Sequence, residues 1–215
     1  MDTSQAARPA PPQGGEDHWR WRPDWAAERA CTFWYLTIPD GSVRLPALEE
    51  YVGALAGVPW LDAVPTRWWH LTLTEIGYAD ELDAGLLREV AAGVAEVVAG
   101  HRALRLGLGP VVRFRTALAL AAGPDDGLRT LQAAVRQRTQ EVLGADRPVM
   151  HPQRFRPHVS LAYVNRDVPG EDVDAVLAQA PAVDAGVTLD RVTLAAVTRQ
   201  DRHYRWRVAD EVRLA

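Results

Sequence analysis

Hydrophobic and polar positions along the chain follow two different spacings. Runs rich in β-branched and aromatic residues predict strands, and apolar residues that recur every three or four positions predict amphipathic helices. Leu82, Leu86, Val90 and Val94, for example, recur at helical spacing. The pattern predicts helices over 45–55, 82–97, 128–142 and 173–177, and strands over 32–38, 68–76, 104–112, 116–122, 155–164, 187–198 and 204–214.

The first part of the chain differs from the rest. It is rich in proline and glycine and shows no apolar periodicity, which is typical of an irregular segment. We therefore expect a flexible N-terminal arm over 1–28 and a single bilobed domain over 29–215. Trp19, Trp21 and Trp25, near the end of the arm, could fold back onto this domain.

The order of the elements and a partial repeat predict the fold class. Helices and strands are mixed, and the short connection Gln200–His203 favours antiparallel pairing, so we expect an α+β fold. Each half of the chain has a helix, then a strand with a His-x-Thr/Ser pattern, then another helix. Similar segments precede these strands, Pro65–Trp69 and Pro152–Pro157. The repeat predicts two lobes related by a pseudo-two-fold axis, each contributing one strand to a shared cleft.

Composition and charge exclude several classes of function. The chain has 28 acidic and 24 basic residues, all of the latter arginine, and its net charge of −4 argues against tight non-specific binding to DNA or long RNA. No apolar run is long enough to span a membrane, and the N-terminus lacks the pattern of a secretory signal. The single cysteine, Cys31, forms neither an intrachain disulfide nor a cysteine-based zinc site. We expect a cytoplasmic protein with no membrane partner.

Two histidines lie in the same local pattern, His70–Leu73 (His-Leu-Thr-Leu) and His158–Leu161 (His-Val-Ser-Leu). Because side chains alternate between the two faces of a strand, each histidine shares a face with the hydroxyl two positions later. The apolar residues of each pattern point toward the core. One such pattern alone would be a weak signal, but two with similar preceding segments indicate a functional pair.

These paired motifs resemble those of the 2H phosphoesterase superfamily, which is named for two His-x-Thr/Ser-x motifs. Within it, the sequence is similar to the bacterial branch of 2'-5' RNA ligases and RNA 2',3'-cyclic phosphodiesterases. The resemblance covers roughly 30–214, and Phe155–Leu161 is its most specific part. It implies a bilobed fold of two facing antiparallel sheets with outer helices and a central cleft. Ser160 stands where threonine is common in the family, and it keeps the hydroxyl.

Two imidazoles and two hydroxyls can open a cyclic phosphodiester without a metal or a cofactor, and we expect neither. A neutral imidazole activates water and a protonated one protonates the leaving ribose oxygen, while hydroxyls donate hydrogen bonds to the phosphoryl oxygens. We therefore expect His70 and His158 to be catalytic and Thr72 and Ser160 to bind phosphate. The reverse reaction would join a cyclic phosphate end to a hydroxyl. The sequence leaves open which histidine is the base.

Residues near the motifs and in the closing hairpin are weaker candidates for substrate contacts. On a regular strand, Trp68 shares the face of His70 and is placed to stack on a base. Tyr163 lies three positions after Ser160 and should point to the opposite face. Arginine side chains are suited to bidentate phosphate contacts. The weaker candidates are Arg67, Trp68, Arg154, Arg156, Tyr163, Arg202 and His203.

The leading interpretation is a metal-independent hydrolase that opens 2',3'-cyclic phosphates, or cleaves and joins 2'-5' linkages, of RNA ends or nucleotides. One alternative is a phosphodiesterase for a narrow small-molecule cyclic phosphate or cyclic oligonucleotide. Another is a nucleotide- or RNA-binding module with vestigial turnover. The presence of both histidines and both hydroxyls favours the enzyme. We expect a monomer, because two lobes already supply both motifs.

Overall fold

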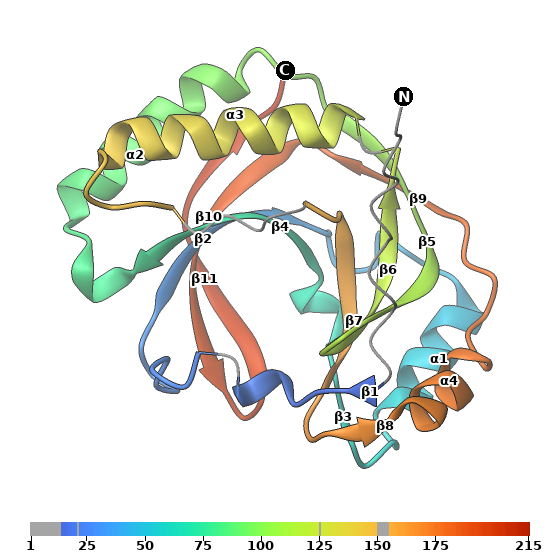
Figure 1. The fold of residues 1–215 in the computed structure, drawn as a ribbon. Helices are drawn as coiled ribbons and strands as arrows, with labels where there is room; N and C mark the ends of the chain where they lie inside the picture. Colours follow the sequence, from blue (N-terminus) through green and yellow to red (C-terminus); the bar gives the residue numbers. More distant parts are fainter. Residues whose placement is uncertain (1–13, 21, 125, 150–154) are drawn as a thin grey trace, which may run out of the picture.

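The computed structural model describes residues 14–20, 22–124, 126–149 and 155–215 (Figure 1). None of the helices in these residues is long and apolar enough to cross a membrane. The helices are α1 (Pro46–Leu55), α2 (Ala84–Val98), α3 (Asp126–Leu143), α4 (Gly170–Leu177) and the 3₁₀ turns η1 (His18–Arg20), η2 (Thr66–Trp68) and η3 (Ala79–Glu81). The strands are β1 (Gly14–Gly15), β2 (Cys31–Thr37), β3 (Leu61–Ala63), β4 (His70–Tyr78), β5 (Leu104–Phe114), β6 (Ala117–Gly123), β7 (His158–Val164), β8 (Val168–Pro169), β9 (Ala185–Leu189), β10 (Arg191–Gln200) and β11 (His203–Arg213).

Two large sheets face each other across a cavity. One has the strand order β11-β10-β2-β4, the other has the order β3-β7-β6-β5-β9, and all neighbours are antiparallel. Helices α2 and α3 pack over the four-stranded sheet, and α1 and α4 lie against the five-stranded one (Figure 1). Each sheet contains one strand with a His-x-Thr/Ser motif, β4 or β7. The predicted α+β fold of two antiparallel sheets with outer helices is confirmed.

The hydrophobic core lies between each sheet and its helices. Trp34 and Leu36 on β2 are completely buried, and the Trp34 indole donates to the Thr139 hydroxyl of α3 at 3.1 Å. Gln132, also on α3, donates to the backbone oxygen of Leu73 at 3.1 Å. Truncating a buried tryptophan such as Trp34 to alanine costs about 3–5 kcal/mol. Because one face of β2 is sealed against the helices in this way, its other face is left to line the cavity.

The chain over 185–200 differs from the prediction of one strand over 187–198. The structure has two strands there, β9 in the five-stranded sheet and β10 in the four-stranded sheet. The break falls at Asp190, where the chain passes from one lobe to the other. Both strands are rich in β-branched residues and no glycine or proline separates them, so the periodicity gives no sign of the change of sheet.

The two motif strands begin later than predicted. Strand β4 begins at His70 and β7 begins at His158, rather than at 68 and 155. Thr66–Trp68 forms the 3₁₀ turn η2, and Pro157 has no N–H to donate to a strand ladder. Each motif histidine is therefore the first residue of its strand, in the same position in both lobes.

Residues 14–20 and 22–30, which we call the N-terminal strap, lie against the domain. The strap contains β1 and η1, and its Trp25 is only 4% exposed. Trp19 packs against the ring of Tyr204 at 5.5 Å between centroids. The described part of the expected flexible arm is thus packed onto the lobes, while 1–13 and Trp21 lie outside the described residues.

Candidate active site

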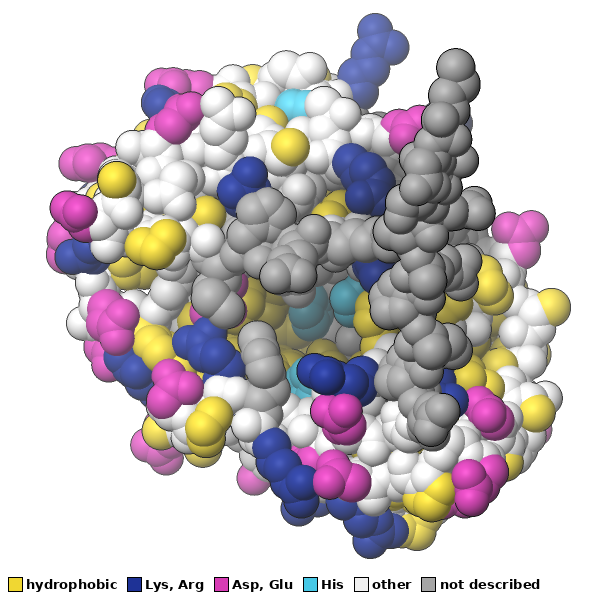
Figure 2. All heavy atoms as spheres, viewed as in Figure 1, with side chains coloured by type: hydrophobic (Ala, Val, Ile, Leu, Met, Phe, Trp, Pro, Cys, Tyr) yellow, Lys and Arg dark blue, Asp and Glu magenta, His cyan; other side chains and the backbone are white. Residues whose placement is uncertain are grey.

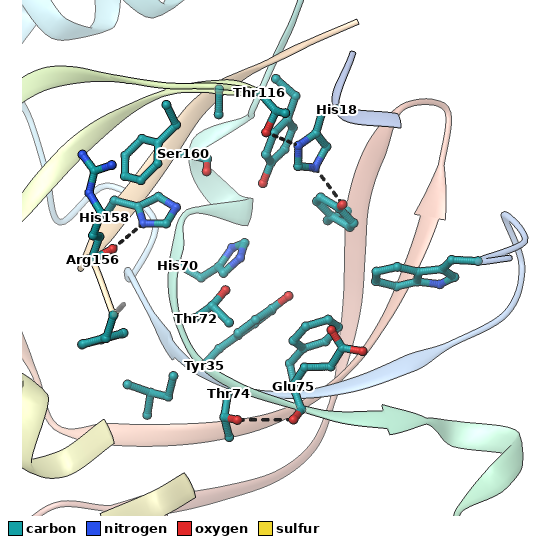
Figure 3. A pocket seen from close by; sticks show the side chains of 18 residues that line it. His18, Tyr35, His70, Thr72, Thr74, Glu75, Thr116, Arg156, His158 and Ser160 are labelled. Carbon is teal, nitrogen blue, oxygen red and sulfur yellow. Dashed lines mark hydrogen bonds between the residues drawn. The ribbon is translucent and has the colours of Figure 1, made fainter. Parts of the chain in front are cut away.

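A cavity of about 540 Å³ lies between the two large sheets. Figure 2 shows a hollow with histidine side chains inside it, and Figure 3 shows the side chains that line the cavity. Strand β4 contributes His70 and Thr72, and β7 contributes His158 and Ser160. The structure therefore brings together the two imidazoles and two hydroxyls that the sequence singled out.

Both histidines form the same hydrogen bond with the backbone that precedes them. His70 Nδ1 lies 2.8 Å from the carbonyl oxygen of Trp68, and His158 Nδ1 lies 2.7 Å from that of Arg156. A carbonyl oxygen only accepts hydrogen bonds, so Nδ1 of each ring carries a hydrogen. The free lone pair of the neutral ring is therefore on Nε2. Because both rings point into the cavity (Figure 3), each Nε2 is available to accept or deliver a proton there.

Aromatic side chains fix the planes of both imidazoles. Tyr35 stacks on His70 with 4.0 Å between ring centroids, and Trp206 meets the same ring edge-on at 4.9 Å. Phe114 lies 4.3 Å from the His158 ring. These contacts restrict rotation of the rings, as a preorganised pair of proton-transfer groups requires.

Burial makes both imidazoles weaker bases than free histidine. Desolvation lowers the pKa of His70, which is 9% exposed, to about 4, against the opposing effect of its hydrogen bond to Trp68. Burial also lowers the pKa of His158, and the nearby Arg156 charge acts in the same direction. His70 is therefore neutral at pH 7, and His158 is the more exposed of the two rings.

A β-bulge after the first motif brings an unexpected carboxylate into the cavity. Tyr35 is opposite Thr72 and Phe33 is opposite Glu75, so three residues of β2 face four of β4. Because cross-strand partners share a face, Glu75 points to the same side as Thr72 and lines the cavity. Its carboxylate is paired with Arg22 of the strap and is largely buried.

An equivalent bulge follows the second motif. Ala119 is opposite Ser160 and Ala117 is opposite Tyr163, so Tyr163 lines the cavity on the same side as Ser160. The prediction that Tyr163 points to the opposite face is therefore wrong, because the bulge shifts the alternation by one residue. Burial raises the pKa of Tyr163 to about 12, against the opposing effect of the Ser160 side chain.

The predicted arginine contacts have different locations. Arg156 lines the cavity, with its guanidinium 4.4 Å from the centroid of Phe114. Arg67 is exposed within η2 and does not line the cavity. Arg202 lies at a smaller hollow between the strap and the β10–β11 hairpin. Arg154 lies outside the described residues.

Trp68 and His203 pack near the cavity without lining it. Trp68 meets Trp206 edge-on at 4.7 Å, because it belongs to a 3₁₀ turn rather than to the strand of His70. Both ring nitrogens of His203 face carbonyl oxygens, those of Asp201 at 2.7 Å and Ala63 at 3.1 Å. The contact with Ala63 connects the β10–β11 hairpin to the opposite lobe.

The described residues place no cluster of metal ligands beside the histidine pair. Within the described ranges, no group of three or more His, Cys, Asp or Glu residues is arranged to hold a metal ion. The Cys31 thiol lies 3.4 Å from the Glu75 carboxylate, and burial raises its pKa well above the usual range. Cys31 is therefore a protonated core residue rather than a nucleophile.

Solved structures of low sequence identity share the fold. TT0787 of Thermus thermophilus has a TM-score of 0.63 at 19% identity, with 86% of this chain and 97% of that chain covered. Escherichia coli LigT in its apo form has a TM-score of 0.61 at 16% identity, with 87% and 98% covered. LigT with 3'-AMP has a TM-score of 0.59 at 15% identity, with the same coverage. Among curated proteins, none matches the sequence significantly.

A family model covers the part of the chain that carries both motifs. The model of the 2'-5' RNA ligase superfamily matches residues 46–201, more than half of the 215 residues. This range includes His70 and His158, the first residues of the two motif strands. The match agrees with the shared fold and confirms the 2H phosphoesterase resemblance. The chain therefore belongs to the 2'-5' RNA ligase superfamily.

Proposed function

We propose that the protein is a metal-independent phosphoesterase that opens the 2',3'-cyclic phosphate of a nucleotide or an RNA end. The observation that carries this proposal is the presence of two equivalent imidazole–hydroxyl pairs, His70 with Thr72 and His158 with Ser160, in one cavity. Family membership supports a phosphoesterase or ligase. LigT has been solved with 3'-AMP, ATP and NADP+, which supports a small nucleotide as the ligand class here.

His70 is suited to be the general base. Its lowered pKa leaves the ring neutral at pH 7, and its Nδ1–H is held by Trp68, so Nε2 accepts the proton of a water molecule. The water oxygen then forms a bond to phosphorus while the bond from phosphorus to one ribose oxygen breaks. The product is a 2'- or 3'-phosphomonoester.

His158 is suited to be the general acid. It is more exposed than His70, and a bound phosphate anion beside it would favour its protonated form. Its Nε2–H protonates the ribose oxygen as that oxygen leaves, so the leaving group departs as an alcohol. One proton enters at His70 and one departs from His158, and exchange with water restores both rings.

The two hydroxyls stabilise charge on the phosphoryl group. Thr72 and Ser160 approach the cavity from opposite sheets, so a phosphate between the imidazoles can accept a hydrogen bond from each. Arg156 at the cavity edge adds a positive charge. Because each proton transfer is reversible, the same chemistry would join a cyclic phosphate end to a ribose hydroxyl in any cavity that admits chain on both sides of the phosphorus.

Hydrolysis of 2',3'-cyclic nucleotides in the presence of EDTA tests the proposal. We expect turnover by wild type and by His101→Ala, a control histidine outside the cavity, with a single phosphomonoester isomer as product. Turnover that EDTA abolishes would contradict metal independence. Salt-dependent binding of RNA without turnover would instead favour a nucleotide-binding module. A protein that neither hydrolyses cyclic nucleotides nor binds RNA would point to a phosphodiesterase for a narrower cyclic phosphate.

A further inference from the structure

The N-terminal strap is anchored to the lobe that contains the five-stranded sheet. Strand β1 pairs with β8, and Glu16 donates its backbone N–H to the carbonyl oxygen of Arg115 at 2.8 Å. The Trp19 indole donates to the Asp62 carboxylate at 2.8 Å. A Cβ on Gly15 would lie 2.9 Å from the side chain of Val168, so this end of the strap is closely packed.

The other end of the strap is anchored to the lobe that contains the four-stranded sheet. Arg22 pairs with the buried Glu75 on β4, and the Tyr78 hydroxyl donates to Asp24 at 2.7 Å. Arg199 on β10 donates to the carbonyl oxygens of Trp19 and Arg22 at 2.9 and 3.0 Å. The strap therefore spans from one lobe to the other (Figure 1).

Two strap residues, His18 and Trp25, form part of the cavity wall. Trp25 stacks on Phe33 at 5.8 Å between centroids and contacts Tyr204 at 5.5 Å. His18 stacks on Tyr163 at 4.2 Å between ring centroids. The strap therefore completes an aromatic wall that extends from the four-stranded sheet to the five-stranded sheet.

The position of His18 is fixed by polar contacts as well as by stacking. Nδ1 lies 3.0 Å from the Thr116 hydroxyl and Nε2 lies 2.8 Å from the Tyr204 hydroxyl. Thr116 and Tyr204 belong to opposite lobes, so His18 itself bridges the cavity. Its stacking partner Tyr163 lines the cavity on the same side as Ser160, so this wall adjoins the phosphate-binding group of the proposed function.

This wall has a direct consequence for the size of the substrate. A cavity of about 540 Å³ has the volume of a site for one small molecule, and aromatic walls stack on any nucleobase. A second nucleotide on the strap side would have to pass through the anchored strap. On the face seen in Figure 2, the hollow and the histidine side chains inside it are visible between the described residues.

We propose that the strap restricts the enzyme to terminal nucleotides, with His18 and Trp25 as specificity-determining residues. The inference rests on the proposed function. Substrates would be mononucleotides and RNA ends that carry a 2',3'-cyclic phosphate, whose preceding chain leaves through the face on which the hollow is visible. A 2'-5' linkage inside an oligonucleotide would be excluded, since it needs chain on both sides of the phosphorus.

The test compares kcat/KM for adenosine 2',3'-cyclic phosphate with that for an oligonucleotide containing one internal 2'-5' linkage. The full-length variants are His18→Ala, which shortens the wall, and Arg22→Ala with Glu75→Gln, which removes one anchor of the strap without leaving a buried charge unpaired. Arg191→Ala, which loses only exposed ion pairs with Asp190 and Glu211, is the matched control.

We expect wild type and Arg191→Ala to prefer the cyclic mononucleotide, and the two strap variants to reduce that preference by about tenfold or more. A folding defect would lower both activities together and leave their ratio unchanged. Equal turnover of both substrates by wild type, or an unchanged ratio in both strap variants when circular dichroism shows them to be folded, would overturn the inference.

A binding measurement separates this inference from the proposed function. Calorimetric titration with 3'-AMP and with a trinucleotide that contains an internal 2'-5' linkage gives the corresponding ratio of binding affinities, without any need for turnover. If no substrate is hydrolysed but wild type binds 3'-AMP selectively and the strap variants lose the selectivity, the proposed function fails and the strap inference stands. Unselective binding in wild type would overturn the inference independently of catalysis.

Discussion

His70 and His158 hold the same ring nitrogen against the same backbone position, with Nδ1 at 2.8 and 2.7 Å from the carbonyl oxygen two residues earlier. Each is also the first residue of its strand, with a hydroxyl two positions later and a β-bulge after that. The pseudo-two-fold relationship therefore includes the tautomer of the two rings. A fixed tautomer places both lone pairs on the atoms that face a shared ligand.

The two hydroxyls should matter about equally, because each is placed to donate one hydrogen bond to a charged phosphoryl oxygen. We expect Thr72→Ala and Ser160→Ala each to lower kcat/KM by about 10- to 100-fold, the equivalent of one charge-assisted hydrogen bond. Thr72→Ser and Ser160→Thr should retain most of the activity, since they keep the hydroxyl. Steady-state kinetics on a cyclic mononucleotide provides the measurement. Unchanged kinetics in both alanine variants would show that the two hydroxyls do not contribute to catalysis.

Tyr163 is expected to act through Ser160 as a positioning residue. Its side chain lines the cavity on the same side as that of Ser160, so Tyr163→Phe should lower kcat/KM by about three- to tenfold. In a Ser160→Ala background the same substitution should have little further effect, because the group it positions is already absent. A double-mutant cycle measures this coupling. Additive losses would show that Tyr163 contributes to activity by another route.

The rate should depend on pH through both imidazoles. The productive free enzyme has neutral His70, which predominates above its pKa of about 4, and protonated His158, which predominates below a pKa that burial lowers from 6.5. The profile of kcat/KM should therefore be bell-shaped with its maximum on the acidic side of neutrality. Bound phosphate raises both pKa values, so the profile of kcat should lie at higher pH. A flat profile across this range would contradict the acid–base pair.

Stability at acidic pH should reveal the buried His18. Burial lowers its pKa to about 3, so the unfolded chain binds this proton more tightly than the folded one, and stability falls as pH falls below 6.5. His18→Asn removes this titration, and between pH 7 and pH 4 its unfolding free energy should fall by about 3 kcal/mol less than that of wild type. Urea denaturation at both pH values measures the difference. Parallel losses in both proteins would show that His18 is not held neutral.

The sequence predicted the motif residues because a repeated local pattern identifies them. Alternation on a strand is sufficient to place His70 beside Thr72 and His158 beside Ser160, and the structure brings all four to one cavity. The family resemblance supplied the facing sheets. The pairing of each histidine with its hydroxyl depends only on the geometry of neighbouring residues along one strand.

Other features depend on pairing between strands and could not be predicted from one chain segment. The bulges that turn Glu75 and Tyr163 toward the cavity exist only in relation to β2 and β6. The change of sheet at Asp190 has no glycine or proline to mark it. His18 lies in a segment without periodicity, and only its long-range contacts with Thr116 and Tyr204 reveal its place.

The most direct test of the central claim is the kinetics of His70→Ala, His158→Ala and the double variant with a 2',3'-cyclic nucleotide. If the two imidazoles act as a pair, each single substitution should lower kcat by about 10²–10⁴-fold. The kcat of the double variant should then be only slightly lower than that of the less active single variant. Circular dichroism and thermal unfolding, with His101→Ala as control, establish that the variants are folded. Near-wild-type turnover by either folded single variant would contradict the account.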